Sequence, residues 1–489
     1  MRAASPLLLP LAGLMARPTR AAEAPVLEIA VDLNTTYQTI DGFGFSEAFQ
    51  RAKGIVNLPE PQRTALVDLL FNATSGAGFT IVRNGIGSSP NSTNDWMNTI
   101  EPQAPARPND EPTYVWDGKD SGQLWVSQQA VKYGVKTFYA DAWSAPGFMK
   151  NNSNDADGGA LCGSPGVDCT TGDWRQAYAN YLVKNVQLYR DNGVNITHLG
   201  FLNEPDFQTA YASMQMDGKQ AADFIKVLQP TLLANNLSDV HVACCDATGW
   251  ATQRTMINDI VAAGAEPLLG VVTSHIYTSK IDGPLPTTRK VWESETADLG
   301  GRWSTAWFSA NASAANDTKA TAGDGLTWAR NIHTALTTGN VSAYLWWVAT
   351  QDAATNNNNN EKLVLVGNGT YTVARRLWAF AQYSRVVRPG AVRVAVTSRS
   401  SVLRTTAFRN ADGAVAVVVI NDGGTDAAVV VDAGLREASA ASPLTAQAWI
   451  TDATHNMGST AVAVAANGTV TGAVVAAHGV LSVVVRPPK

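Results

Sequence analysis

The sequence ITHLGFLNEP at residues 196–205 carries the two features on which the fold and the chemistry of this chain depend. It begins as a short apolar run, which is typical of a buried strand. It ends in Glu204, and Pro205 follows at once and stops the strand, because proline has no backbone N–H for a sheet ladder. The stretch therefore predicts a strand that delivers a carboxylate at its carboxyl end.

Seven further apolar runs alternate with longer amphipathic segments along the same part of the chain. One such segment is residues 174–191, in which Tyr178, Leu182 and Tyr189 recur at helical spacing. Strands that alternate with helices indicate a parallel sheet built from βα units. Eight of them predict an α/β fold of the (β/α)8 TIM-barrel type. The predicted strands are residues 39–45, 79–84, 135–140, 196–203, 240–246, 269–275, 290–295 and 343–348.

After residue 390 the sequence changes to short alternating runs of Val, Ala and Thr separated by Gly, Asn and Asp turns. This pattern indicates an antiparallel β-sandwich. Residues 26–31 alternate in the same way, so the first strand should join this side domain before the chain enters the barrel. We expect a signal peptide at 1–24, the N-terminal strand of the side domain at 25–38, the catalytic barrel at 39–385 and the β-sandwich side domain at 386–489.

The composition is that of a globular protein, with 45% hydrophobic residues, 16% charged residues and a formal net charge of -5. The sequence has no basic patch, and its pI of about 5.7 weakens attraction to polyanions, which argues against a nucleic-acid partner. After the N-terminal segment no run approaches the roughly 20 apolar residues of a membrane span. The six His residues lack metal-ligand spacing. We expect a monomer with no metal and no cofactor.

The N-terminus resembles a secretory signal, with Arg2, an apolar stretch at 7–15 and small residues at 21–24. Asn-X-Ser/Thr acceptor sites recur from Asn34 to Asn467, as in proteins that pass through a eukaryotic secretory route. These features predict a secreted, extracellular glycoprotein.

The four cysteines fit an oxidising compartment. Cys162 and Cys169 flank a short Gly- and Pro-containing loop that a disulfide could pin. Cys244 and Cys245 are adjacent, and they form either a vicinal disulfide or a pair of buried thiols on a strand. The sequence leaves these two alternatives open.

Two glutamates lie where predicted strands end, which is where TIM barrels carry their active sites. Glu204 ends the fourth strand, and Glu295 ends the seventh strand in the sequence WESE. Strands four and seven face each other across the barrel mouth, and retaining glycosidases need two carboxyl groups about 5–5.5 Å apart. Alternatively both acids are solvated loop residues, or the chain is a carbohydrate-binding protein without activity. Two acids at matching strand ends favour catalysis.

Aromatic residues near the strand ends are candidates for sugar contacts, because the C–H faces of a sugar ring stack on aromatic rings. Trp143, Tyr277 and Trp347 are the candidate platforms, and His275 is a candidate polar contact. Each could instead be a core residue, since buried aromatic side chains are common.

Five motifs in order resemble glycoside hydrolase family 30, and the resemblance covers the chain from about residue 26 onward. They are DGFG at 41–44, SAPGFMK at 144–150, LNEP at 202–205, WESE at 292–295 and QYSRVVRPG at 382–390. Within the family, GFSEAFQRA at 44–52 resembles the fungal xylanase branch, whose members include glucuronoxylanases and xylobiohydrolases. The resemblance implies a retaining β-1,4-xylanase. A β-1,6-glucanase or β-1,6-galactanase of the same family is the alternative.

The resemblance also implies roles for single residues. Glu204 is expected to be the acid/base and Glu295 the nucleophile, with Asn203 placed to bind the sugar 2-hydroxyl. Arg83 should lie beside Glu295 and keep it ionised, since a neighbouring cation lowers a carboxyl pKa. A structural salt bridge is the alternative for Arg83. Burial and a neighbouring carboxylate should keep Glu204 protonated before cleavage.

The choice of substrate depends on loops that depart from the bacterial xylanases of the family. Those enzymes bind a glucuronic acid branch with an arginine after strand eight, where this chain has a run of Asn at 356–360, expected to be a mobile polar loop. Arg51 after strand one could bind the carboxylate instead, or it could be a surface residue paired with Glu47 or with nothing. Glu47 has no motif role and is expected to be structural. The loop at 87–101 could close the far end of the cleft and favour release of xylobiose.

Overall fold

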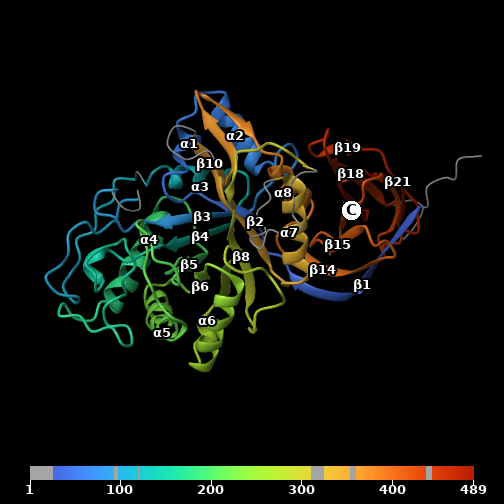
Figure 1. Ribbon diagram of the computed structural model, residues 1–489. Coiled ribbons are helices and arrows are strands. Elements are labelled where there is room, and N and C mark those ends of the chain that lie inside the picture. Colours follow the sequence, from blue (N-terminus) through green and yellow to red (C-terminus); the bar gives the residue numbers. More distant parts are fainter. Residues whose placement is uncertain are drawn as a thin grey trace, which may run out of the picture.

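The computed structural model describes residues 26–92, 97–118, 120–309, 324–352, 359–436 and 443–488. Within them the chain forms a closed barrel and a separate β-sheet domain that lie side by side (Figure 1). The expected signal peptide at 1–24 lies outside the described residues. This architecture is the predicted TIM barrel with a β-sandwich side domain.

Eight parallel strands form the barrel, and β10 closes it by pairing with both β2 and β8. Each strand overlaps one of the predicted runs. Large apolar side chains fill the interior, among them Tyr139, Trp292 and Leu345. The barrel strands are β2 (Gly42–Ser46), β3 (Ile81–Ile86), β4 (Thr137–Ala142), β5 (His198–Gly200), β6 (His241–Ala247), β7 (Val271–His275), β8 (Lys290–Thr296) and β10 (Ala343–Asp352).

Strand β5 is shorter than the predicted run, and it ends at Gly200 instead of Asn203. The backbone then leaves the ladder, because Glu204 has a left-handed φ of 47° and its N–H donates to the carbonyl of Asp246 at 2.9 Å. Gly200 itself has no room for a side chain, since a Cβ there would lie 2.0 Å from Oδ1 of Asp141. The glycine therefore makes space for a buried carboxylate beneath the barrel mouth.

Helices follow most strands and pack around the barrel (Figure 1). Helix α4 begins one residue later than predicted. Helix α5 begins with a capping box, in which the Asp217 side chain accepts from two backbone N–H groups. The helices are α1 (Lys53–Val56), α2 (Gln62–Phe71), α3 (Gln123–Lys132), α4 (Arg175–Asp191), α5 (Gly218–Ala234), α6 (Trp250–Ala262), α7 (Gly325–Thr337) and α8 (Arg376–Ser384), with short 3-10 turns η1 (Gly147–Met149) and η2 (Glu266–Leu268).

Two small strand pairs extend the rim of the barrel. Strands β12 (Lys362–Gly367) and β13 (Thr370–Val373) continue the sheet beyond β10, and β9 (Asp298–Arg302) pairs with β11 (Asn359–Asn360). Residues 356–358 of the Asn run lie outside the described residues. For the described part the expectation of a mobile loop was wrong, because Asn360 is buried. Its amide donates to Asp298 at 3.0 Å, and its oxygen accepts from the backbone N–H of Ser304 at 2.7 Å.

The side domain is a ten-stranded sheet in which β1 lies between β14 and β17. Strand β1 is antiparallel to β14 and parallel to β17, so the N-terminal strand belongs to this sheet. Alternate residues of β17 are buried, as the period-two pattern requires. The strands are β1 (Leu27–Thr39), β14 (Val392–Ser398), β15 (Leu403–Arg409), β16 (Val415–Asn421), β17 (Ala427–Asp432), β18 (Thr445–Thr451), β19 (Gly458–Thr460), β20 (Ala463–Val464), β21 (Thr469–Val475) and β22 (Val480–Arg486).

The barrel and the side sheet share one hydrophobic core. Helix α8 packs against β18 and β22, and Phe380 lies in the same buried cluster as Phe408 and Val484 of the sheet. The indole N–H of Trp307 donates to the carbonyl of His478 at 2.7 Å across this boundary. The shared core holds the two domains in one arrangement. None of the described helices is both long and apolar enough to cross a membrane.

Both cysteine pairs are bonded in the structure. Cys162 is joined to Cys169 across the loop after η1, and Cys244 is joined to Cys245 within β6. Of the alternatives for the adjacent pair, the structure has the vicinal disulfide. It directly precedes Asp246, whose contacts are described below.

Candidate active site

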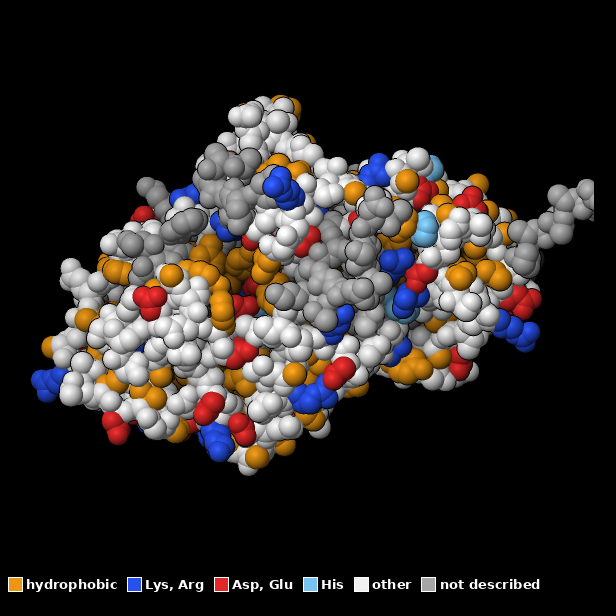
Figure 2. Space-filling model, viewed as in Figure 1, with side chains coloured by type: hydrophobic (Ala, Val, Ile, Leu, Met, Phe, Trp, Pro, Cys, Tyr) orange, Lys and Arg blue, Asp and Glu red, His pale blue; other side chains and the backbone are white. Residues whose placement is uncertain are grey.

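A cavity of about 600 Å³ opens at the carboxyl ends of the barrel strands. On the face seen in Figure 2 the barrel is hollowed, and hydrophobic side chains gather around acidic ones in the hollow. The volume suits a small ligand or part of a longer one. The cavity is lined by Phe49, Arg51, Trp143, Asn203, Glu204, Ala210, Tyr211, Tyr277, Glu295, Leu299, Trp347, Asn359 and Glu361.

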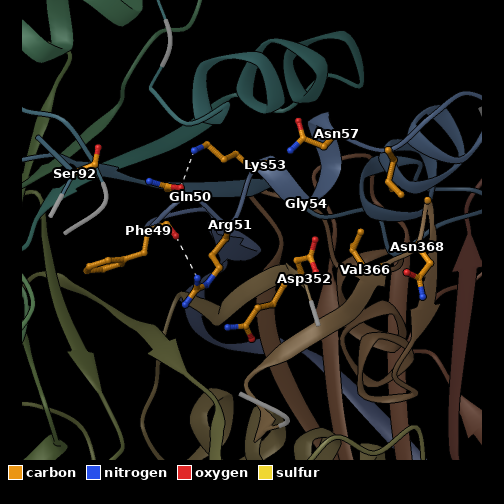
Figure 3. A pocket seen from close by; sticks show the side chains of 14 residues that line it. Phe49, Gln50, Arg51, Lys53, Gly54, Asn57, Ser92, Asp352, Val366 and Asn368 are labelled. Carbon is orange, nitrogen blue, oxygen red and sulfur yellow. Dashed lines mark hydrogen bonds between the residues drawn. The ribbon is translucent and has the colours of Figure 1, made fainter. Parts of the chain in front are cut away.

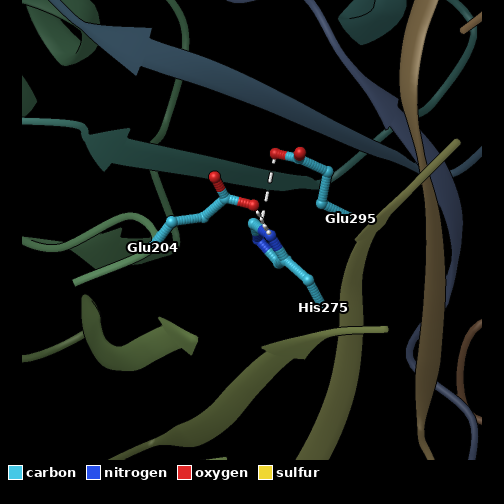
Figure 4. Close-up of side chains that lie close together, drawn as sticks. All are labelled: Glu204, His275 and Glu295. Atoms are coloured by element: carbon cyan, nitrogen blue, oxygen red, sulfur yellow. Dashed lines mark hydrogen bonds and ion pairs between the residues drawn. The ribbon is translucent and has the colours of Figure 1, made fainter. Parts of the chain in front are cut away.

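The two predicted glutamates meet in this cavity from opposite sides of the barrel. Glu295 lies near the end of β8, and Glu204 lies four residues after β5 (Figure 4). One oxygen of each carboxylate and a ring nitrogen of His275 all lie within 4.8 Å of one another. Carboxyl groups about 5–5.5 Å apart are typical of retaining glycosidases, whereas inverting enzymes hold them about 6.5–9.5 Å apart. Glu293, the other acid of the WESE motif, is fully buried and does not line the cavity.

Arg83 in β3 ties Glu295 to its surroundings. Its side chain is fully buried, and its guanidinium donates to Oε2 of Glu295. The Nη2 group donates to Asp141 and to Oδ1 of Asn203, both at 2.6 Å. The expected contact between Arg83 and Glu295 is present. A guanidinium with three carboxylate or amide partners fixes the position of Glu295 and of the residue before Glu204.

Asp246 is the buried anion at the centre of the site. It is an extra residue in β6, where the register with β7 shifts between Cys245 and Ala247. Its Oδ2 accepts from Thr273 at 2.7 Å and from the Tyr139 hydroxyl. Its Oδ1 accepts from Ser294 and lies 3.6 Å from Arg83. Burial alone would raise the pKa of Asp246, but Arg83 and the donors outweigh it and bring the pKa to about 2.

His275 lies beneath the acid/base candidate instead of in the cavity. It is fully buried, and its Nδ1 is 3.1 Å from Oε1 of Glu204 while its Nε2 is 3.3 Å from Asp246. Burial alone would lower the pKa of His275, but the carboxylates of Glu295, Asp246 and Glu204 raise it well above its ordinary value. The raised pKa favours the protonated imidazole, which donates to Glu204 from Nδ1 and lies within ion-pair distance of Asp246 at Nε2. The expectation of a direct contact with the sugar is not met, because Glu204 covers the ring.

The two glutamates have different surroundings. Burial raises the pKa of Glu204, and the nearby carboxylate of Glu295 adds to this against the opposing contact with His275. Because His275 holds Oε1, a proton on Glu204 belongs on the other oxygen. The Tyr277 hydroxyl donates to Oε1 of Glu295 at 3.0 Å, and the Arg83 guanidinium donates to Oε2. A carboxyl group with a raised pKa therefore faces a carboxyl group that accepts from two donors, which is the arrangement of a general acid and a nucleophile.

Aromatic rings form one wall of the cavity. Phe49 makes edge-on contacts with Trp143, Tyr211 and Trp347, at centroid distances of 5.1, 5.6 and 5.9 Å. Trp143 also lies over the Arg83 guanidinium at 4.6 Å. The predicted aromatic residues Trp143, Tyr277 and Trp347 all line the cavity. Trp143 and Trp347 also pack on each other at a centroid distance of 5.9 Å, so these two rings belong both to the core and to the site.

Arg51 lines the cavity but is not a surface residue. Its side chain is 12% exposed, and its nearest carboxylate is Glu361 at 3.8 Å. Its Nη1 donates to the carbonyl of Phe49 at 3.2 Å. Glu47 is fully buried with neither carboxylate oxygen hydrogen-bonded, and burial raises its pKa well above the ordinary value. The expected pairing of Arg51 with Glu47 is therefore replaced by a pairing with Glu361.

Several site residues were not predicted. Asp141 and Asp246 both lie at the ends of barrel strands, so the rule that located the glutamates would also have found them. Phe49 and Tyr211 lie in loops and carry no periodic signal. Glu361 also lines the cavity, but in the sequence it follows the Asn run, for which we expect a mobile polar loop and not a strand end.

Among the described residues, Glu204, His275 and Glu295 form the group that could hold a metal ion, because each offers one ligand atom within 4.8 Å of the others. In the structure His275 contacts both glutamates, and Glu295 also accepts from Arg83 and Tyr277. A buried arginine and a protonated imidazole beside the carboxylates supply the positive charge that a cation would otherwise bring.

Comparison with known proteins identifies the two domains. Residues 40–385 match the family model described as Glycosyl hydrolase family 59, and residues 390–452 match the Glycosyl hydrolase family 30 beta sandwich domain. Two curated relatives are an endo-1,6-β-D-glucanase of Aspergillus fumigatus and a putative glucosylceramidase of Caenorhabditis elegans. The first is 25% identical over 81% of this chain and 80% of its own length, and the second is 26% identical over 81% and 76%.

A solved structure resembles the whole described chain more strongly. The catalytic domain of the family 30 xylanase C from Talaromyces cellulolyticus is 41% identical, with a TM-score of 0.84 over 94% of this chain and 99% of that domain. Its match spans the barrel and the side domain together, and the side domain alone also matches family 30. The chain therefore belongs to glycoside hydrolase family 30 and is a glycosidase.

Proposed function

We propose that this glycosidase is a retaining β-1,4-xylanase in which Glu204 is the acid/base and Glu295 the nucleophile. The observation that carries the proposal is the pair of facing carboxyl groups, with atoms within 4.8 Å of one another and with the pKa of Glu204 raised by burial. In the first step Glu204 protonates the leaving oxygen while Glu295 attacks the anomeric carbon. In the second step Glu204 takes a proton from water, which displaces Glu295 from the sugar.

The neighbours of the two glutamates support this division of roles. Protonated His275 stabilises Glu204 as an anion in the interval between the two steps, because it donates to Oε1. Arg83 and Tyr277 each donate to one oxygen of Glu295 and so orient it for attack. Since Oδ1 of Asn203 is held by Arg83, the NH2 group of Asn203 is left to bind the sugar 2-hydroxyl.

The anomeric outcome and single substitutions test the chemistry. NMR of the first-formed product should show a β anomer, and an α anomer would exclude the mechanism. Glu295→Ala should lose turnover while keeping its melting temperature. Turnover at the wild-type rate would refute the nucleophile assignment, whatever the substrate.

Xylan as the substrate is the narrower part of the proposal. It is supported by the 41% identity to a xylanase, which exceeds the 25% identity to the endo-1,6-β-D-glucanase. We would digest glucuronoxylan, linear xylan, the β-1,6-glucan pustulan and arabinogalactan, and size the products. Release of oligosaccharides from pustulan or arabinogalactan without any from xylan would replace the xylanase by a β-1,6-glucanase or β-1,6-galactanase. Binding without products from any of them would favour the non-catalytic alternative.

The same digests test whether Arg51 binds a glucuronic acid branch. Its unpartnered Nε group supports the role, whereas its contact with Glu361 supports a structural one. If Arg51 binds the uronate, Arg51→Gln should lose the preference for glucuronoxylan over linear xylan. An unchanged preference leaves the structural role.

We also propose that the protein is secreted, as the N-terminal sequence indicates. Expression in a fungal host should give protein in the medium whose N-terminus starts after residue 20. Full-length protein retained inside the cell would contradict this.

A further inference from the structure

A second cavity of about 590 Å³ lies beside the reaction cavity (Figure 3). Phe49 and Arg51 line both cavities, so these two side chains form the partition between them. The second cavity lies over the α1 loop and the extension of the sheet by β10 and β12. A ligand in the second cavity is therefore separated from a sugar in the reaction cavity by the side chains of Phe49 and Arg51.

The wall of this cavity contains a buried carboxamide with no partner. Gln351 of β10 is 1% exposed, and neither its Oε1 nor its Nε2 is hydrogen-bonded among the described residues. Such a group costs free energy in the empty protein, because both its donor and its acceptor have lost water. A hydroxyl group, which donates and accepts at one point, satisfies it.

The charges around the cavity compensate one another. Arg51 lies 3.8 Å from Glu361, and the ammonium group of Lys53 donates to the side chain of Gln50 at 2.7 Å. Asp352 adds an acid to the lining. Together with Glu361, which lines the reaction cavity on the other side of Arg51, two cations and two acids leave no excess charge to attract an ion. The remaining polar side chains are mainly amides, including Asn57 and Asn368, and apolar surface comes from Phe49, Leu58 and Val366.

We infer that the second cavity binds a neutral sugar residue of the same polysaccharide that occupies the reaction cavity, with Gln351 as its central polar contact. The inference rests on the proposed function, since it assumes that a polysaccharide fills the reaction cavity. Amides for the hydroxyl groups and apolar surface for the C–H faces are the chemistry that carbohydrate sites use. The sugar is either a neutral branch or a further residue of the main chain.

The test is Gln351→Leu, which keeps the size of the side chain and removes both polar atoms. Gln447→Leu is the matched control, because Gln447 is an exposed glutamine of β18 in the side domain, remote from both cavities. The substrates are linear xylan, xylan with neutral arabinosyl branches, and xylan with uronic acid branches. We expect Gln351→Leu to raise KM about five- to tenfold with kcat unchanged, as for a contact that is the same in ground and transition states.

The pattern of the loss identifies the sugar. A loss on arabinosyl-branched xylan alone assigns the cavity to a branch, and an equal loss on linear xylan assigns it to the main chain. A loss confined to uronic acid-bearing xylan, or no loss on any substrate, overturns the inference. Asn57→Ala at the exposed rim should give a smaller change in the same direction, and it replaces Gln351→Leu if that variant does not fold.

Binding without turnover separates this inference from the proposed function. Glu295→Ala protein, with and without Gln351→Leu, is run through native gels that contain arabinoxylan, linear xylan or pustulan. Weaker retardation of the double variant in any of the three gels supports the second cavity even if wild-type enzyme releases nothing from xylan. Equal retardation in all three refutes it while leaving the xylanase proposal intact.

Discussion

Replacing Asp246 by Asn should destabilise the protein and should do so in a pH-dependent way. The folded pKa of Asp246 is about 2, against an ordinary value of 3.8. At about 1.4 kcal/mol per pKa unit, this difference is worth about 2 kcal/mol of folding stability. Because the folded pKa is depressed, that stability is present above pH 3.8 and is lost as the pH falls towards 2. Because the unfolding entropy grows with chain length, a loss of about 2 kcal/mol lowers the melting temperature of a chain of 489 residues by about 2–3 °C.

Differential scanning calorimetry at one scan rate, from about pH 3 to pH 7, measures this effect. The gap between wild type and Asp246→Asn should be full near pH 6 and should have fallen to about half by pH 3. Asp141→Asn is the matched control, because Asp141 contacts the same Arg83 but burial and the charge of Asp246 raise its pKa well above the ordinary value. A neutral Asp141 loses no charge on substitution, so that variant should cost far less. Equal losses for the two variants, or none for Asp246→Asn, would refute the charge assignment.

Further predictions concern activity. Tyr277→Phe removes one hydrogen bond to the Glu295 carboxylate, and such a bond is worth about 1.5–3 kcal/mol. The value of kcat/KM should therefore fall by about 10- to 150-fold. A fall of less than about twofold would show that this hydrogen bond does not stabilise the transition state. Glu204→Gln should slow xylan hydrolysis by about 10²–10⁴ and affect an aryl xyloside with a good leaving group much less. Because the folded pKa of Glu204 is raised above 4.5, wild-type kcat/KM should fall as pH rises through that higher value, and Glu204→Gln should lack this alkaline limb. Trp347→Ala should raise KM by about two- to tenfold if the ring stacks on a sugar, whereas loss of kcat alone would indicate a packing role. Dialysis against EDTA should leave kcat unchanged, and a loss of activity that a divalent ion restores would contradict the expectation that no metal is needed.

The fold was predictable because its signals are local and repeated. Each barrel strand is a short apolar run, most of these strands are followed by a helix, and strands of the side sheet such as β17 alternate between buried and partly exposed positions. The ends of elements were less predictable, since they depend on contacts that are distant in sequence. Strand β5 ends early because Glu204 bonds to the backbone of Asp246, and Asn360 is ordered because Asp298 and Ser304 hold it.

The candidate site was predictable where a carboxylate or an aromatic ring follows a strand. Glu204, Glu295, Trp143 and Trp347 were found in this way and lie in one cavity. The position of His275 was not predictable, because whether a side chain faces a ligand or lies under another residue depends on packing. The partners of charged residues were also not predicted. Arg51 pairs with Glu361, which follows the Asn run in the sequence, and not with Glu47, which is nearer in sequence.

The place of β1 in the side sheet has a consequence for synthesis of the chain. Strand β1 is the first described strand in the sequence, yet both of its neighbours, β14 and β17, come after the last helix of the barrel. During translation it must therefore stay without its partners while the whole barrel is made, and contacts of such long sequence separation form slowly. An unpaired strand of this length is open to pairing with other chains. Truncation of the side domain should therefore lead to aggregation during expression and not to an isolated active barrel.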